Sequence, residues 1–579
     1  MRVIATAGHV DHGKSTLLEA LTGDSPDRLA EERRRGLTID LGFVSMPLPG
    51  GEELAFIDVP GHRRFLTNTV AGLAGAPAVL LVVAADEGWM PQTTQHLAAM
   101  TAFGNEHLLV AITKTDVADP GDATGQVIER LKHAGYGDAP VVPVSARTGE
   151  GLQRLRHRLD ETTAAVPIPD PSAPPRLWID RSFTVTGAGT VVTGTLTAGC
   201  LDRDTRLELS PSGESVSIRG LHCLGRPVDT VVAPARVAVN LRRVAADTAK
   251  RGYALVAPGR WWRTALIDVR MPHDGRPPAE VLIHCGTAVV AARVRRLGDD
   301  LVRLSLARSL DLHNGDRLLI RDPGNAALSA GTVLDVDPPP LRGRGAAAAR
   351  AGRLTALSAL RRSGLARRAD LIAMGETCDG EGVVHGEWII DTEHHDRLVR
   401  ELVVLVERYA RDHPTDPGMP VLRAQRLLKL PDPALVAAVA GALKIYDGRI
   451  YAEGGTDDIP EAVARVARVF RDAVAGSLFR SPTREQLSDR GLSQAMLARA
   501  VAAGLLLKVG ELHLLPDAPR EAVELLAHLP QPFTVAQARI ALDTNRRVAI
   551  SLLEHLDAVG ATRRTSEGKR CVVSPLRSP

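Results

Sequence analysis

The fold of the first part of the chain is decided by the stretch Ala7-Gly8-His9-Val10-Asp11-His12-Gly13-Lys14-Ser15-Thr16. It follows a short apolar run, residues 3–6, and precedes residues 17–21, whose leucines predict a helix. The spacing G-x4-G-K-[ST] between a strand and a helix is typical of loops that bind nucleotide phosphates. Glycines let backbone N–H groups surround the phosphates, and the helix N-terminus adds a favourable dipole. The alternative is an ordinary glycine-containing loop before a helix.

Three side chains in this region have the chemistry of a magnesium–phosphate site. Lys14 is expected to reach the β- and γ-phosphates, and the Ser15 hydroxyl to coordinate Mg²⁺. Residues 34–40, Arg-Arg-Gly-Leu-Thr-Ile-Asp, are charged and lack periodicity. Within them Thr38 could ligate Mg²⁺ only while the terminal phosphate is present. On its own, this segment would be no more than a solvated loop.

The motif Asp-Val-Pro-Gly-His at residues 58–62 follows another apolar run. Asp58 fits the carboxylate that holds Mg²⁺ through water, and the Gly61 N–H fits a donor to the γ-phosphate. His62 is then placed to orient the attacking water. A histidine in a loop is usually only a surface residue, but its position directly after this motif favours the catalytic interpretation.

The first 170 residues alternate apolar runs with helical segments, which predicts a doubly wound α/β sheet with its ligand at the carboxyl ends of the strands. The expected strands are residues 3–7, 54–59, 78–84, 108–113 and 141–144. The fourth strand ends in Thr-Lys-Thr-Asp, and the fifth in Ser-Ala-Arg. Asp116 can accept both N1–H and N2–H of guanine, which adenine cannot offer, and the Ser145–Ala146 backbone can donate to O6. We therefore predict a GTP-binding domain over residues 1–170.

The predicted GTP and Mg²⁺ contacts come from every one of these motifs. They are Gly8, His9, Val10, Asp11, His12, Gly13, Lys14, Ser15, Thr16, Asp58, Gly61, Thr113, Lys114, Asp116, Ser145, Ala146 and Arg147, with Ser15, Thr38 and Asp58 at the metal.

Composition narrows the class of protein further. A chain of 579 residues should hold about three to six domains. The net charge of +3 permits nucleic-acid binding without requiring it, and the five scattered cysteines indicate a reducing compartment. The longest apolar run, residues 76–85, is half of a membrane span and reads as a buried parallel strand. With a predicted strand starting at Arg2 or Val3, we expect no signal peptide, no membrane partner and a cytoplasmic location.

After a proline-rich linker at residues 166–175, the pattern changes to short alternating strands and Gly/Pro turns. This pattern predicts β-barrels or sandwiches. We assign two β-barrels, at residues 171–258 and 259–340.

The motifs G-H-V-D-H-G-K-S, R-G-L-T-I-D and D-V-P-G-H resemble those of the translational GTPases typified by elongation factor Tu. The hairpin at residues 183–194 and the segment 314–333 resemble parts of that family's two barrels. The resemblance implies that His62 is catalytic and that Val10 and Leu37 form an apolar gate beside it. Thr113 departs from the family's usual N-K-x-D, which puts the guanine contact in question. Threonine there is typical of one branch, the selenocysteine-specific elongation factors.

In that family the groove between the GTPase domain and the second domain holds the aminoacyl end of a tRNA. By resemblance, Phe43, Asp180, Arg181 and Arg236 line this pocket. A selenol is mostly ionised at neutral pH and a serine hydroxyl is not, so guanidinium groups should favour the selenocysteinyl form. Alternatively, both arginines pair with carboxylates or bind the tRNA backbone.

The tail repeats a turn glycine, at Gly386, Gly448, Gly510 and Gly568, spaced 62, 62 and 58 residues apart. The turns read His385-Gly386, Asp447-Gly448, Val509-Gly510 and Glu567-Gly568, each before a short apolar strand. A period of about 60 residues with helices and a terminal hairpin predicts tandem α+β winged helices. We place them at residues 341–395, 396–456, 457–517 and 518–579. An ordinary helical domain with coincidental glycines is the alternative.

The fourth unit carries the clearest nucleic-acid signal. Arg546 and Arg547 lie in the first turn of a predicted recognition helix, and the wing adds Arg563, Arg564, Lys569 and Arg570. Such a set suits a structured RNA loop, with phosphates held and an exposed base read. A winged helix can also bind a protein, and two adjacent arginines are often only a solvated face.

The domain order resembles the bacterial selenocysteine-specific elongation factors along essentially the whole chain. The resemblance implies a monomeric factor that carries selenocysteinyl-tRNA to the ribosome at a UGA codon marked by an mRNA hairpin (SECIS), with GTP hydrolysis triggered by the ribosome. One alternative is a general aminoacyl- or initiator-tRNA-binding GTPase without hairpin recognition, which the four-fold tail disfavours. Another is a GTP-regulated nucleic-acid-binding repressor, which the barrels disfavour.

Overall fold

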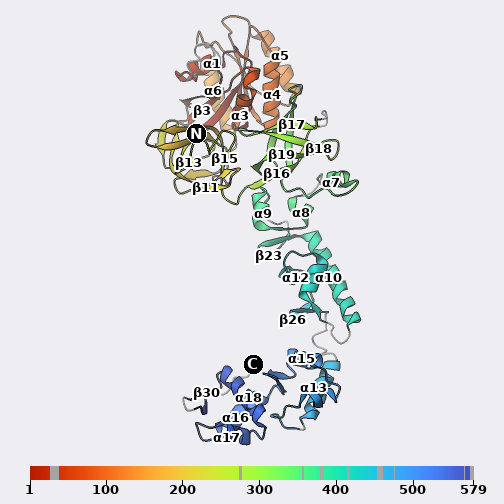
Figure 1. Cartoon of the computed structure of the whole chain (residues 1–579). Helices are drawn as coiled ribbons and strands as arrows, with labels where there is room; N and C mark the ends of the chain where they lie inside the picture. Colours follow the sequence, from red (N-terminus) through yellow and green to blue (C-terminus); the bar gives the residue numbers. More distant parts are fainter. Residues whose placement is uncertain are drawn as a thin grey trace. The chain divides into compact units, whose positions relative to one another are not determined.

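The structure is a computed structural model, and it forms two compact units, Met1–Asp391 and Thr392–Pro579 (Figure 1). It describes residues 1–26, 38–272, 277–354, 358–377, 380, 382–413, 418–446, 448–452, 461–474, 476–565 and 568–573. Among the described helices, none combines the length and the apolar character needed to cross a membrane.

The first domain is built on a six-stranded sheet of order β2-β3-β1-β4-β5-β6. The strands are β1 (Arg2–Ala7), β2 (Gly42–Pro47), β3 (Glu53–Asp58), β4 (Ala78–Ala84), β5 (His107–Thr113) and β6 (Val141–Pro143). The five expected parallel strands are confirmed to within a residue. Strand β2, which pairs antiparallel with β3 at the edge, was missed because its alternation is weak.

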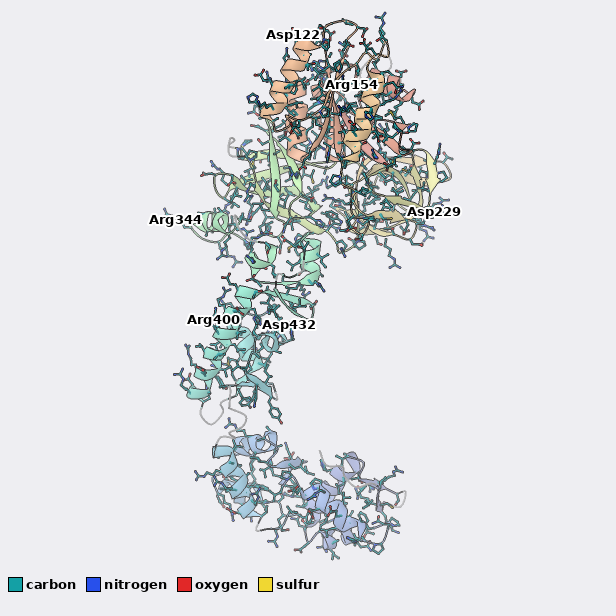
Figure 2. All side chains as sticks on the ribbon, turned by 180° about the vertical axis from the view of Figure 1, so that it is seen from behind. Asp122, Arg154, Asp229, Arg344, Arg400 and Asp432 are labelled. Atoms are coloured by element: carbon teal, nitrogen blue, oxygen red, sulfur yellow. The ribbon has the colours of Figure 1, made fainter. Side chains whose placement is uncertain are left out.

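Helices cover both faces of this sheet, because neighbouring residues of each strand point to opposite sides. Val3 and Ala5 join one core cluster, and Ile4 between them joins the other. The first cluster packs under α3 (Leu66–Ala74), α4 (Pro91–Phe103) and α5 (Gly121–His133), and the second under α1 (Lys14–Thr22) and α6 (Leu152–Ala164). A short 3₁₀ helix, η1 (Arg63–Phe65), precedes α3. Charged side chains such as Asp122 of α5 and Arg154 of α6 are exposed outside these layers (Figure 2).

Two barrels follow, as expected. The first ring runs β10-β15-β7-β8-β14-β11, and it closes because β10 also pairs with β11. Its strands are β7 (Arg176–Val185), β8 (Gly189–Leu196), β10 (Arg206–Ser210), β11 (Glu214–Cys223), β14 (Ala235–Leu241) and β15 (Ala254–Val256), with β9 (Cys200–Asp202), β12 (Arg226–Val228) and β13 (Thr230–Val232) beside them. The second is a closed barrel of β16 (Trp262–Arg270), β17 (Glu280–Cys285), β18 (Ala288–Arg296), β19 (Leu301–Leu312), β20 (Arg317–Arg321) and β21 (Leu328–Asp335).

The tail repeats helices followed by an antiparallel hairpin, as the period of the glycines predicts. The first set is α7 (Ala346–Leu354), α8 (Ala359–Ser363), β22 (Leu365–Arg367), α9 (Arg368–Ala373), β23 (Gly382–His385) and β24 (Trp388–Asp391). The second is α10 (Thr392–Asp412), β25 (Met419–Pro420), α11 (Val421–Leu428), α12 (Leu435–Ala438), β26 (Lys444–Tyr446) and β27 (Arg449–Tyr451). The third is α13 (Glu461–Ala473), α14 (Arg484–Ser488), α15 (Gln494–Ala502), β28 (Leu507–Val509) and β29 (Leu512–Leu514). The fourth is α16 (Ala518–Ala527), α17 (Val535–Ala541), α18 (Arg546–Ala558), β30 (Thr562–Arg564) and β31 (Arg570–Val572).

All four turn glycines have positive φ, the conformation that a tight turn asks of glycine. Two of their predicted turn partners, Asp447 and Glu567, lie outside the described residues. The exact domain boundaries remain predictions.

A buried charge cluster joins the second barrel to α7. Asp268 is fully buried and accepts hydrogen bonds from Arg303 Nε at 2.7 Å and Arg350 Nε at 2.8 Å. Arg350 also pairs with Asp335 at the end of β21. These charges offset the cost of their burial only as a complete set.

We therefore expect Asp268→Ala to destabilise this region by about 3–5 kcal/mol, because the buried Arg303 loses its carboxylate partner and the buried Arg350 loses one of two. Hydrogen exchange of β16 and β19 amides measures the effect locally. The control is Asp300→Ala, whose exposed carboxylate lies 3.5 Å from Arg270; it should cost less than about 1 kcal/mol. Equal exchange in the two variants would contradict the role of the cluster.

Candidate functional site

The loop between β1 and α1 has the backbone of a phosphate-binding loop. Gly8, Asp11 and Gly13 all have positive φ. A Cβ on Gly8 would lie 2.1 Å from Val82 O, so no other residue fits there. Lys14 Nζ donates to the carbonyls of Gly8 at 3.2 Å and His9 at 2.6 Å. The ammonium group is therefore already held at the loop that it is expected to serve.

The second motif lies directly against this loop. A Cβ on Gly61 would be 2.6 Å from Val10 N and 2.7 Å from Lys14 Nζ. Only glycine permits this approach, which places the Gly61 N–H beside the predicted phosphate position.

The three predicted metal ligands lie together. Ser15 Oγ is 2.9 Å from Thr38 Oγ1 and donates to Asp58 Oδ2 at 2.7 Å. The other oxygen, Asp58 Oδ1, accepts from Thr6 Oγ1 at 2.6 Å. Two hydroxyls and a carboxylate are the hard oxygen ligands that Mg²⁺ prefers, so the residues present fit this ion.

His62 lies in the loop after Gly61 and is half-buried. Its Nδ1 accepts the Arg64 N–H at 3.2 Å, and its ring centroid is 6.0 Å from that of Phe65. Of the two predicted gate residues, Val10 is half-buried, and Leu37 lies outside the described residues.

Helix α4 supplies two contacts that sequence reasoning missed. Gly8 N–H donates to His96 Nδ1 at 2.9 Å, and Val10 N–H donates to Gln92 Oε1 at 3.1 Å. Burial lowers the pKa of His96 to about 3, so its ring stays neutral and can accept. The only available signal was the pair of polar residues four apart, which lie on one face of a helix. Burial likewise lowers the pKa of His12, inside the loop, to about 4.

The predicted guanine-binding residues come together at the ends of β5 and β6. Ser145 Oγ donates to Asp116 Oδ1 at 2.7 Å, and this hydrogen bond lowers the pKa of Asp116, which therefore stays ionised. Ala146 and Arg147 follow Ser145 directly. Asp116 is thus held by Ser145 in the acceptor state that guanine requires.

Thr113 and Lys114 connect this base site to its surroundings. Thr113 Oγ1 donates to His12 O at 2.7 Å. Lys114 Nζ lies 3.0 Å from Asp86 and 3.4 Å from Glu87. Burial alone would lower the pKa of Lys114, but these carboxylates raise it. The threonine that replaces the family's usual asparagine therefore ties the base site to the phosphate loop.

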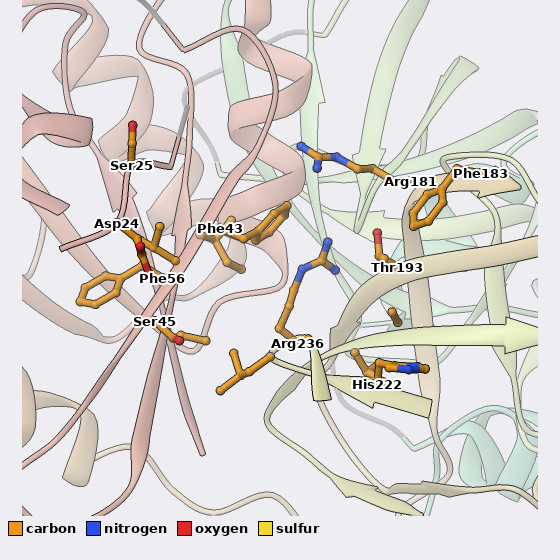
Figure 3. Close-up of a pocket in the computed structure, with 17 residues that line it drawn as sticks. Asp24, Ser25, Phe43, Ser45, Phe56, Arg181, Phe183, Thr193, His222 and Arg236 are labelled. Carbon is orange, nitrogen blue, oxygen red and sulfur yellow. The ribbon is translucent and has the colours of Figure 1, made fainter. Parts of the chain in front are cut away.

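A cavity of about 700 Å³ lies between the first domain and the first barrel (Figure 3). Its lining includes Phe43, Arg181, Phe183, Thr193, His222 and Arg236. The guanidinium carbons of Arg181 and Arg236 lie 5.2 Å and 3.9 Å from the centroid of the Phe43 ring, within cation–π range.

Both pocket arginines also pair with carboxylates, as the alternative interpretation expected. Arg236 contacts both oxygens of the buried Asp180, at 2.9 Å and 2.7 Å, and Thr193 also donates to Asp180. Arg181 Nε donates to Asp40 Oδ2 at 3.1 Å. Three of the four predicted pocket residues, Phe43, Arg181 and Arg236, line the cavity. Asp180 was expected there too, but it is not among the lining residues and instead pairs with Arg236.

In the second unit, the predicted RNA-binding residues lie on two elements, helix α18 and the hairpin of β30 and β31. Arg546 and Arg547 are exposed in the first turn of α18, whose N-cap Asn545 accepts from Val548 N–H. Arg563 and Arg564 are exposed on β30, and Lys569 is half-buried.

Arg570 differs from the other five. It is buried, and its Nε lies 2.8 Å from Asp557. Its backbone also exchanges two hydrogen bonds with Phe533. These contacts give Arg570 a role in holding the wing on α18, instead of the exposed position that the sequence suggested.

Comparisons with known proteins agree with this architecture. Residues 1–165 match the family Elongation factor Tu GTP binding domain, residues 276–340 match Selenocysteine-specific elongation factor, beta-barrel domain, and residues 524–571 match Elongation factor SelB, winged helix. A protein of Escherichia coli (strain K12) named Selenocysteine-specific elongation factor is 33% identical over 605 residues, covering 97% of each chain. A protein of the same name from Desulfomicrobium baculatum is 40% identical over 55% of this chain and 53% of its own. The crystal structure of bacterial selenocysteine-specific elongation factor EF-Sec superposes with a TM-score of 0.77 at 25% identity, covering 99% of this chain and 100% of that one.

Thr113→Val tests the hydrogen bond between the base site and the phosphate loop. Loss of the donor to the buried His12 carbonyl should cost about 1 kcal/mol, or a roughly fivefold higher Kd for GDP. A titration with fluorescent GDP measures it. The matched control is Thr115→Val, because Thr115 Oγ1 is buried without a hydrogen-bond partner among the described residues. An unchanged Kd for Thr113→Val would show that this hydroxyl does not support nucleotide binding.

Proposed function

Because the chain belongs to the selenocysteine-specific elongation factors, we propose that it carries selenocysteinyl-tRNA to the ribosome at UGA codons marked by an mRNA hairpin. The observation that carries this proposal is the cavity beside Phe43. Two guanidinium groups meet there, between the GTPase domain and the first barrel.

The first domain is a GTPase of the elongation factor Tu type. Lys14 and the backbone of its loop hold the phosphates, while Asp116 and Ser145 hold guanine. Mg²⁺, held by Ser15, Thr38 and Asp58, would offset the charge of the β- and γ-phosphates. The Gly61 N–H supports the γ-phosphate.

His62 orients the attacking water, and no covalent enzyme intermediate forms. The ribosome stimulates hydrolysis by moving the His62 side chain into the position where it orients this water. The half-buried ring directly follows Gly61, whose backbone lies against the phosphate loop.

The pocket distinguishes the aminoacyl group by charge. Asp180 neutralises Arg236 and fixes its guanidinium near Phe43, while the Arg181 guanidinium lies farther from the same ring. A selenolate entering beside them gains charge-assisted contacts, and a serine hydroxyl gains only neutral ones. The Arg236 side chain is mostly buried, which limits the screening of its charge and strengthens the difference.

The fourth winged helix reads the mRNA hairpin. Arg546 and Arg547 present their side chains at the start of α18, and Arg563 and Arg564 present theirs from the wing. Together they form two exposed basic edges suited to phosphates and an unstacked base. The factor acts as a monomer in the cytoplasm, where its ribosomal partner is found.

The decisive measurement compares GTP-dependent protection of selenocysteinyl-tRNA and seryl-tRNA against ester hydrolysis by the full chain. We expect selenocysteinyl-tRNA to be protected at least about tenfold better, since one charge-assisted contact is worth about 1.5–3 kcal/mol. His62→Ala should leave this protection intact while abolishing ribosome-stimulated hydrolysis. Equal protection of the two tRNAs would instead favour a general tRNA-binding GTPase.

Arg546→Ala and Arg547→Ala test the recognition helix. Each removes one exposed cation, so each should weaken binding of an RNA hairpin to the full chain by about 1–3 kcal/mol without changing basal GTPase activity. A gel-shift titration at fixed salt measures the affinity. The control is Arg520→Ala on α16, an exposed arginine that pairs with Glu521. Unchanged affinity in both variants would exclude α18 as the reading element.

A further inference from the structure

Asp40 connects the nucleotide-sensing segment to the arginines of the first barrel. Its Oδ2 lies 3.0 Å from Arg181 Nη2 and accepts from Arg181 Nε at 3.1 Å. Its Oδ1 accepts from Arg251 Nη1 at 3.4 Å. Arg181 Nη2 also donates to the Leu41 carbonyl. Asp40 is therefore shared between two arginines of the barrel.

Arg251 was not among the residues that sequence reasoning singled out. It lies just before β15 and does not line the cavity, so it acts on the pocket only through Asp40. Its Nη2 is buried and has no hydrogen-bond partner among the described residues. The contact with Asp40 is therefore an important ion pair for this guanidinium group.

The arginines in and beside the pocket do not each have a carboxylate of their own. Asp180 balances Arg236, whereas one carboxylate, Asp40, serves both Arg181 and Arg251. Asp40 therefore offsets the charge of Arg181 only in part, because it also pairs with Arg251. Asp24 lies elsewhere in the lining of the cavity. Arg181, Asp40 and Arg251 each expose about a third of their side chains, so water screens these charges only in part.

We propose that Asp40 and Arg251 tune the charge that Arg181 presents to the aminoacyl pocket, and thereby the preference of the pocket for an anionic side chain. This inference rests on the proposed function. Because Arg251 also pairs with the Asp40 carboxylate, Asp40 neutralises Arg181 only in part. The remaining positive charge of Arg181 can attract the ligand. Without Arg251, Asp40 neutralises Arg181; without the charge of Asp40, Arg181 acts on the ligand in full.

The same carboxylate is anchored to the GTPase domain. Asn68 of α3 donates to Ile39 O at 2.8 Å and lies 3.5 Å from Asp40 Oδ1. Thr38, two residues before Asp40, contacts Ser15 at the metal site. The charge seen by the aminoacyl group is therefore set by a residue whose backbone is held at the nucleotide site.

The test measures the affinities of the full chain with GTP for selenocysteinyl-tRNA and seryl-tRNA and takes their ratio. Arg251→Gln should lower the preference for selenocysteinyl-tRNA by about tenfold, and Asp40→Asn should raise it by a similar factor. Arg251→Lys keeps the charge and should preserve the preference. The affinity for seryl-tRNA, whose side chain is neutral, should change less than about twofold in all three.

Matched controls are Arg203→Gln and Asp229→Asn, an exposed ion pair at 3.0 Å in the same barrel, which should leave the ratio unchanged. If Asp40 and Arg251 had a purely structural role, Arg251→Gln and Asp40→Asn would each lower the affinity for the two tRNAs by the same factor. If the native chain discriminates while Arg251→Gln and Asp40→Asn keep its ratio, the inference is overturned and the proposed function stands. If the native chain does not discriminate, the pocket assignment itself fails.

Discussion

The carboxylate of Asp58 is the point on which the nucleotide site depends. It is fully buried and accepts hydrogen bonds from Thr6 on one oxygen and from Ser15 on the other. A buried carboxylate needs such partners, and parallel pairing of β1 with β3 supplies Thr6 from the neighbouring strand. The sheet, the phosphate loop and the predicted magnesium site are therefore fixed by one set of contacts.

The phosphate loop is held from the outside as well. His96 and Gln92 accept its backbone N–H groups, which would otherwise be left without partners when no phosphate is present. Burial keeps His96 neutral, so it adds no positive charge of its own. Thr113 holds the carbonyl side of the same loop. The geometry of the loop is thus supported by α4 and β5.

Arginines share carboxylates both beside the pocket and in the second barrel, but the two clusters differ in burial. Near Phe43, the partly exposed Arg181 and Arg251 share the Asp40 carboxylate, so their charges remain accessible to solvent. Around Asp268, Arg303 and Arg350 also share one carboxylate, but all of these groups are buried, which suits a fixed joint between domains. The same residue types therefore form a solvent-accessible cluster in one place and a buried, rigid one in the other.

The sequence by itself determined the repeating and locally coded features. Strand–loop–helix alternation, the spacing of Gly8, Gly13 and Lys14, and the glycine period of the tail each depend on near neighbours in the chain, so they predict strands, motif positions and hairpins closely. Tertiary structure alone decided which side chains meet across distance. Asp40 with Arg251, His96 with Gly8, and the burial of Arg570 on Asp557 join residues whose separation in sequence carries no periodic signal, because their contacts follow from how sheets, helices and barrels pack.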